Sequence, residues 1–116
     1  MLTRTITFDN VVPLLLEAIP EFQGDAEDVA ENLVYLVFPD FMRFAKRKLE
    51  DKESEQLLMR VFAFLEKAAQ SRDARVTEML RDALHELAIP DPDRPRALMG
   101  KATRRLFGKV VKEVYR

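Results

Sequence analysis

The sequence lacks the residues on which several classes of functional site depend. It has no cysteine, which excludes a disulfide framework, a thiol nucleophile and a zinc knuckle, and which fits a reducing cytoplasm. His85 is the only histidine, so no second imidazole is available for a metal site. Ser54 and Ser71 are the only serines, and there is no Gly-rich phosphate loop. These absences disfavour an enzyme, and we predict no catalytic residue, cofactor or metal.

Long apolar runs are also absent. No stretch approaches the roughly 20 apolar residues of a membrane span, and the N-terminus MLTRTITFDN has no signal-peptide core. We therefore expect a soluble, cytoplasmic protein with no membrane contact. The 116 residues are 47% hydrophobic and 34% charged, a balance typical of one globular domain with one core. We predict a single helical domain over residues 1–116.

Apolar residues recur at helical spacing along nearly the whole chain, and no long alternating segment indicates a strand. Pro39 should kink or end the second helix, because proline removes a backbone donor. The proline-rich residues 89–95 should form a stiff connector that is not helical. This pattern predicts an all-α fold of five or six helices, either an orthogonal bundle or a short stack of helical hairpins. The predicted helical segments are residues 11–19, 25–38, 41–49, 58–69, 76–87 and 101–115.

Charge is distributed very unevenly. Residues 5–42 contain eight acids and no Lys or Arg, whereas residues 94–116 contain eight bases and only one acid. Surface fields of this kind affect partners and encounter rates more than the fold. The acids at the start of the second helix have two interpretations. They either imitate phosphates in a cationic cleft of a partner, or complement the helix dipole and aid solubility. These residues are Asp25, Glu27, Asp28 and Glu31.

The last predicted helix has a basic stripe opposite its apolar face. Such a stripe fits a phosphate backbone, where neutralised phosphates release counterions. However, its polar face offers no aromatic, Asn or Gln side chain to stack on or read bases. Its simplest interpretation is a solvated face, and its alternatives are a protein partner or nucleic acid. The candidate nucleic-acid-binding residues are Lys101, Arg104, Arg105, Lys109 and Lys112.

Other side chains are best explained by packing and capping. Tyr35, Phe38, Phe41 and Phe44 are spaced to share one side of a helix and should pack in the core. Phe62 and Phe64 differ by about 200° on a helix, so one of them should be exposed or contact a neighbouring helix. Ser71 is expected to cap a helix. An acidic cluster across two helices is a further possibility, made of Glu66, Asp73, Glu78 and Glu86.

Residues 57–87 carry the pattern L-x-x-R-V-F-x-F-L-E-K-x-x-x-S-x-D-x-x-V-x-x-x-L, followed by Glu86-Leu87. With Ile19-Pro20-Glu21-Phe22 and Gly100-Lys101-Ala102-Thr103, this pattern resembles a family of small, all-helical bacterial proteins of unknown function. Some proteins of this kind look like immunity partners of bacterial toxins. The resemblance implies a fold and a style of function, without a mechanism.

Segregated charge without catalytic chemistry favours a non-enzymatic protein-interaction module. We expect an immunity- or antitoxin-like inhibitor whose acidic N-terminal surface binds a basic partner, such as a toxin. The alternative is a nucleic-acid-binding regulator that uses the basic C-terminal helix. A third interpretation is that the acidic and basic ends pair, within one chain or in a homodimer.

Overall fold

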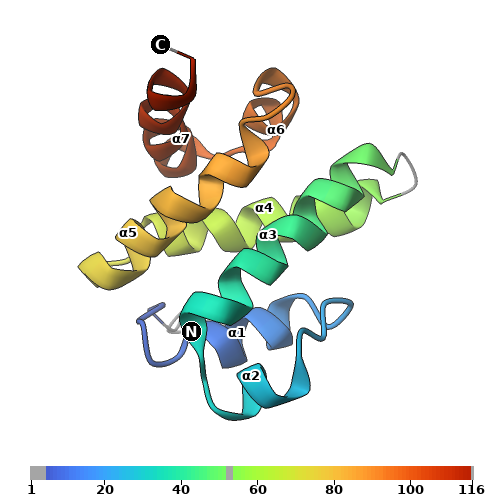
Figure 1. Ribbon diagram of the computed structural model, residues 1–116, viewed down its shortest axis with the longest axis vertical. Coiled ribbons are helices and arrows are strands. Elements are labelled where there is room, and N and C mark those ends of the chain that lie inside the picture. Colours follow the sequence, from blue (N-terminus) through green and yellow to red (C-terminus); the bar gives the residue numbers. More distant parts are fainter. Residues whose placement is uncertain (1–4, 52–53, 116) are drawn as a thin grey trace.

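The computed structural model describes residues 5–51 and 54–115, and these residues form helices joined by short turns (Figure 1). The expected all-α class is confirmed, but the expected number of five or six helices is too low. The described residues contain seven α-helices and one 3-10 helix, η1. In chain order they are α1 (Val11–Ala18), α2 (Ala26–Ala30), α3 (Val34–Glu50), α4 (Glu55–Ala69), α5 (Ala74–Ala83), η1 (Leu84–Leu87), α6 (Asp93–Leu98) and α7 (Lys101–Val114).

Two features differ from the predicted pattern: the break between the second and third helices lies at Asn32 instead of Pro39, and an additional α-helix begins within residues 89–95. The chain breaks at Asn32, whose φ of 53° is left-handed, so residues 25–38 divide between α2 and α3. Asn is one of the few residues other than Gly that adopts this conformation readily. Pro39, by contrast, lies inside α3 without ending it. A proline inside a helix destabilises the helix by about 3 kcal/mol. Burial of Phe38 and Phe41, on the same helix, stabilises the fold by about 1.5–3 kcal/mol for each side chain and so offsets this loss. The second error is in residues 89–95, because α6 begins at Asp93 and includes Pro95.

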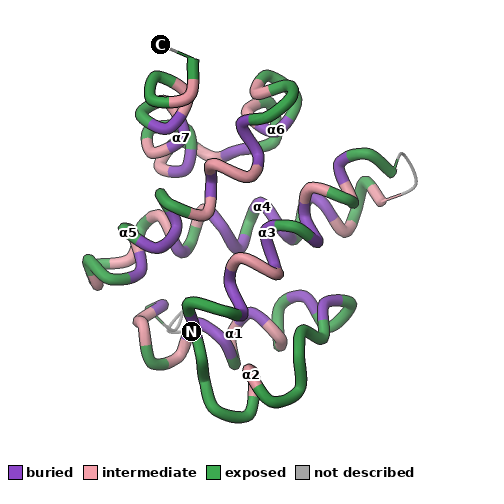
Figure 2. The backbone as a smooth tube through the Cα atoms, in the orientation of Figure 1, coloured by how far each residue is buried: buried purple, intermediate pink, exposed green. Residues whose placement is uncertain are grey.

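The hydrophobic core lies where α3, α4 and α5 meet (Figure 2). Phe41 is fully buried at its centre. Its ring centroid lies 5.3 Å from that of Phe22, 5.9 Å from that of Phe38 and 6.2 Å from that of Phe64. The core role expected for the aromatic residues of α3 is therefore confirmed except for Tyr35, whose side chain is 63% exposed.

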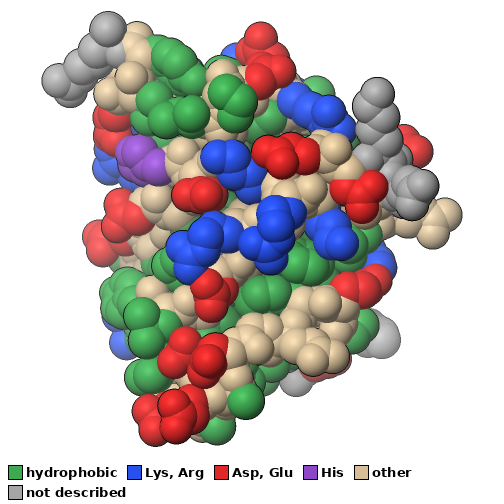
Figure 3. Space-filling model, turned by 45° about the vertical axis from the view of Figure 1, so that its right-hand side comes forward, with side chains coloured by type: hydrophobic (Ala, Val, Ile, Leu, Met, Phe, Trp, Pro, Cys, Tyr) green, Lys and Arg blue, Asp and Glu red, His purple; other side chains and the backbone are tan. Residues whose placement is uncertain are grey.

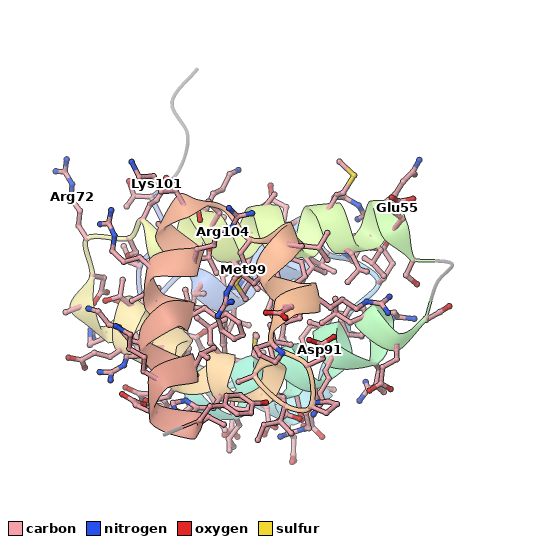
Figure 4. The ribbon with its side chains drawn as sticks, turned by 90° about the horizontal axis from the view of Figure 1, so that it is seen from above. Glu55, Arg72, Asp91, Met99, Lys101 and Arg104 are labelled. Carbon is pink, nitrogen blue, oxygen red and sulfur yellow. The ribbon has the colours of Figure 1, made fainter. Side chains whose placement is uncertain are left out.

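Phe62 and Phe64 are both buried, so neither is exposed. The other expected outcome, contact with a neighbouring helix, is confirmed, because the ring of Phe64 packs against that of Phe41 on α3. Although they point in different directions from α4, this helix is covered on more than one side. It packs against α1 and α3 and also against α5 and α7. Figure 4 shows α7 crossing α4 steeply. Two opposed faces of α4 are consequently both part of the core.

Two carboxylates join segments that are distant in sequence. Glu66 on α4 accepts hydrogen bonds from the backbone N–H groups of Ala102 (3.1 Å) and Thr103 (2.9 Å) at the start of α7. Asp73 caps α5 and accepts a bond from the N–H of Phe8 at 2.9 Å. The residue that caps α5 is thus Asp73, whereas the Ser71 hydroxyl donates to the carbonyl of Ile6 at 2.6 Å. Because Glu66 and Asp73 bind different segments, they do not form the acidic cluster considered from the sequence.

Candidate interaction surfaces

The predicted acidic residues lie on and beside α2, which has no fully buried residue. Asp25 is the N-cap of this helix and accepts a hydrogen bond from the N–H of Asp28 at 3.0 Å. Asp25, Glu27 and Glu31 are exposed, and Asp28 is half-buried. The carboxylates at the helix start therefore combine two roles: they complement the helix dipole, and they remain accessible to another molecule.

The charges around α2 are alike and close enough to influence one another. Partial burial raises the pKa of Asp28, and the negative charges of Asp25, Asp40, Glu27 and Glu31 raise it further. Within residues 5–51 and 54–115, no ion pair neutralises any of the four predicted acids. Asp40 on α3 belongs to the same field, although it also pairs with Arg43. We call this group the acidic surface, and it consists of Asp25, Glu27, Asp28, Glu31 and Asp40.

Two apolar side chains lie within this charged region. Leu33 is 37% exposed and Leu36 is 53% exposed. Leu36 lies one turn before Asp40 on α3, and Leu33 is the residue directly before this helix. The sequence analysis missed this feature, although a signal was present: Leu36 falls outside the buried stripe of Val34, Val37 and Phe38. The two leucines thus add exposed apolar area beside the carboxylates.

The predicted basic residues all project to solvent from α7. Lys101, Arg104, Arg105, Lys109 and Lys112 are exposed, and none of them forms an ion pair with another described residue. Arg104 reaches across toward α6 (Figure 4), where its Nε donates to the carbonyl of Arg96 at 3.1 Å. Glu113, the only acid of α7, pairs instead with Arg81 and His85.

The acidic and basic surfaces lie at opposite ends of the molecule. Figure 1 shows α2 at one end of the longest axis and α7 at the other. In Figure 3, acidic side chains gather at the level of α2, and Lys and Arg side chains form a band at the level of α3. Exposed bases on α3 include Arg43 and Arg47, which the sequence analysis did not consider. The two ends therefore do not neutralise each other within one chain.

The structure offers little that resembles a catalytic or metal centre in the described residues. No group of three or more His, Asp or Glu side chains there is arranged to hold a metal ion.

Three surface cavities have volumes of about 220, 190 and 520 Å³. The first lies between α3 and α5, next to Arg43 and Tyr35. The second and third both border Arg94, on the side of the molecule where α6 lies.

One known protein family matches most of the chain. Residues 12–116 match the family described as Domain of unknown function (DUF7674). The chain belongs to the DUF7674 family. The matched segment contains α2, α3 and α7, so both charged surfaces lie within the DUF7674 domain. No curated protein and no solved structure matches the chain. Among the described residues of this DUF7674 protein, no helix has the length and apolar character needed to cross a membrane.

Proposed function

We propose that this DUF7674 protein is a non-enzymatic protein-interaction module, and that its acidic surface binds a basic surface of a partner protein. One observation carries the proposal. Leu33 and Leu36 are exposed beside the carboxylates on and next to α2, and these carboxylates form no ion pair with a described residue. The leucines supply apolar contact area beside the carboxylates. The carboxylates around them attract and orient a basic partner.

Electrostatics on α2 gives this proposal an energetic reason. Burial is the largest cause of the raised pKa of Asp28, and repulsion from the neighbouring carboxylates raises this pKa further. A bound cationic surface would remove that repulsion and lower the pKa of Asp28 again. A cluster of like charges lowers the stability of the free protein and increases its affinity for a cationic partner. Binding surfaces commonly show this trade of stability for function.

The more specific form of the proposal is an immunity- or antitoxin-like inhibitor of a basic bacterial toxin. The carboxylates of the acidic surface would occupy a cleft that normally receives phosphate groups. Support comes from the resemblance of residues 57–87, 19–22 and 100–103 to small bacterial helical proteins, some of them immunity-like. The α2 segment presents its carboxylates from a single short helix, which suits insertion into a cleft.

The test uses matched variants that each remove four charges. The acidic variant carries Asp25→Asn, Glu27→Gln, Asp28→Asn and Glu31→Gln, and Asn at position 25 keeps a competent N-cap. The basic variant carries Lys101→Gln, Arg104→Gln, Arg105→Gln and Lys109→Gln. Each tagged protein is used to capture binding partners from a lysate of its source organism, with and without nuclease, at low and high salt.

We expect the wild type and the basic variant to capture the same basic protein after nuclease treatment, and the acidic variant to lose it. Affinity for that protein should fall at least tenfold on neutralisation at low salt, and by less at high salt, because salt screens exposed charges. A partner retained by the acidic variant would show that the contact lies elsewhere. Recovery of the chain with only its own copies would favour a homodimer instead.

The exposed and unpaired bases of α7 support a second candidate, a nucleic-acid-binding regulator. In that case nuclease would release the captured material, and the basic variant alone would lose it. Binding would also weaken steeply with salt, because each neutralised phosphate releases counterions. The absence of base-reading side chains on the polar face of α7 makes this the weaker candidate.

A further inference from the structure

A pocket between α3 and the α5–η1 segment provides a second recognition element beside the acidic surface. Its volume is about 220 Å³. Met42 and Met79, both buried in the core, contribute to its lining, together with Pro39 and Ala83, and Tyr35 stands at its edge. The apolar part of this pocket is therefore formed by side chains from two elements that are about 40 residues apart in the chain.

The size of the pocket limits what it can hold. Sites for cofactors and drug-sized ligands usually have volumes of about 300–1,000 Å³, which is larger than this cavity. A single apolar side chain is the better fit. Methionine side chains are flexible and polarisable, so Met42 and Met79 can adjust their shape around such an anchor.

The charges at the rim indicate what surrounds that anchor. The two basic residues there, Arg43 and His85, already have partners. Arg43 pairs with Asp40, and His85 contacts the carbonyl of Asp82 (3.0 Å) through Nδ1 and the carboxylate of Glu113 (3.1 Å) through Nε2. The carboxylates of Asp82 and Glu86 have no ion pair with any residue in the described part of the chain. The rim consequently presents two uncompensated negative charges.

The pocket is continuous with the acidic surface through the N-terminal half of α3. Arg43 lines the pocket and pairs with Asp40, which belongs to the acidic surface. One partner segment can therefore contact both features at once.

We propose that this pocket binds an apolar side chain from a basic peptide segment of the partner, while neighbouring Lys or Arg residues of that segment contact Asp82 and Glu86. The inference rests on the proposed function and adds the recognition element within it. A peptide of this composition satisfies the apolar lining, the volume and the free carboxylates together. An acidic or purely polar segment would leave at least one of them uncompensated.

The experiment is an NMR titration of the isotope-labelled full chain with two synthetic peptides, acetyl-Lys-Lys-Leu-Lys-Lys-amide and acetyl-Lys-Lys-Ala-Lys-Lys-amide. We expect the leucine peptide to shift the amide signals of Met79 and Ala83 and to bind about tenfold more tightly than the alanine peptide, because the anchor buries additional apolar area. Equal affinities for the two peptides, or no shift at Met79 and Ala83, would overturn the proposal.

Variants separate the pocket from general charge attraction. Ala83→Tyr should fill the pocket and abolish the preference for leucine, whereas Ala63→Tyr, at an exposed site on α4, should preserve it. If the larger side chain at position 83 prevents folding, the surface variant Asp82→Asn/Glu86→Gln provides an independent test. It should weaken both peptides equally and leave the tenfold ratio unchanged. Unaltered affinities would refute the role of the rim carboxylates.

The same spectra distinguish this inference from the proposed function. Shifts at Asp25, Glu27 and Glu31 with both peptides would support the acidic surface as the site of basic partners, whatever occurs in the pocket. Pocket shifts without any response of α2 would support the anchor site and contradict the role of the acidic surface. The proposed function and the pocket proposal are therefore tested by the NMR signals of different residues.

Discussion

Glu66 lies on α4, yet its carboxylate acts as the N-terminal cap of α7. Gly100 precedes α7 and has no side chain that can cap it. Glu66 takes this role by accepting bonds from two backbone N–H groups and from the Thr103 hydroxyl at 2.8 Å. Burial acts to raise the pKa of Glu66, but these hydrogen bonds outweigh it and hold the pKa below its usual value. One side chain thus anchors the helix that carries the basic surface.

The close approach of Gly100 to Glu66 leads to a test of this anchor. A Cβ atom at position 100 would lie 2.5 Å from the Glu66 carboxyl carbon. Gly100→Ala should therefore displace the carboxylate and lower the free energy of unfolding by about 1–2 kcal/mol, the usual value of a cap bonded to a charged group. In a Glu66→Ala background the same change should cost nothing. Urea unfolding of the four proteins measures this coupling, and additive losses would contradict it.

Asp73 provides a second test at the residue scale, through pH. The side chain of Arg75 and the N–H of Phe8 bind its carboxylate and lower its pKa from 3.8 to about 2. A lowered pKa stabilises the folded state above the unfolded pKa, and this contribution is lost as the pH falls from 3.8 toward 2.

Asp73→Asn should accordingly be less stable than the wild type at neutral pH, and the gap should narrow as the pH approaches 2. The measurement is urea unfolding of both proteins across this range. Other carboxylates titrate in both proteins, so the difference between the two curves isolates Asp73. If the difference in free energy of unfolding between the two proteins stays constant down to the lowest pH, the ionised carboxylate of Asp73 does not stabilise the fold through Phe8 or Arg75.

At the scale of elements, the turn at Asn32 determines where the acidic surface ends and the core helix begins. The left-handed residue separates α2 from α3, and its side chain donates to the carbonyl of Asp9 at 3.3 Å. Without this break, a single helix from Asp25 would continue through Leu33 and Leu36. Exposure of the two leucines beside α2 thus depends on one backbone conformation.

Two substitutions at position 32 isolate that conformation. Both Asn32→Gly and Asn32→Ala remove the bond to Asp9, but only glycine adopts a positive φ without strain. We expect the alanine variant to be less stable than the glycine variant by about 1 kcal/mol. Urea denaturation of the pair measures the difference directly. Equal stabilities would mean that the turn is not left-handed in solution.

At the scale of the whole molecule, the net charge of −1 conceals a strong separation of charge. The acidic surface and α7 lie at opposite ends of the molecule and do not compensate each other (Figure 1). Under the proposed function, a basic partner would meet a directional field that increases the rate of encounter and favours one orientation. This explains why removal of four acids should affect association mainly at low salt, whereas the fold should tolerate it.

The sequence by itself determined the helical class and the segregation of charge. It also determined that no metal site can contain two imidazoles, because the chain has one histidine. These properties depend on composition and on contacts within one helical turn, so local periodicity was sufficient to predict them. It also located most of the core, including Phe38, Phe41 and Phe44.

Only the tertiary structure decided how many sides of each helix are buried. Burial depends on which distant segments pack against a helix, and α4 is covered on two sides, which buries both Phe62 and Phe64. The α3–α5 pocket and the cap from Glu66 to α7 likewise join residues more than 30 positions apart. No repeat along the chain encodes such contacts, because they form only when separate elements meet in space.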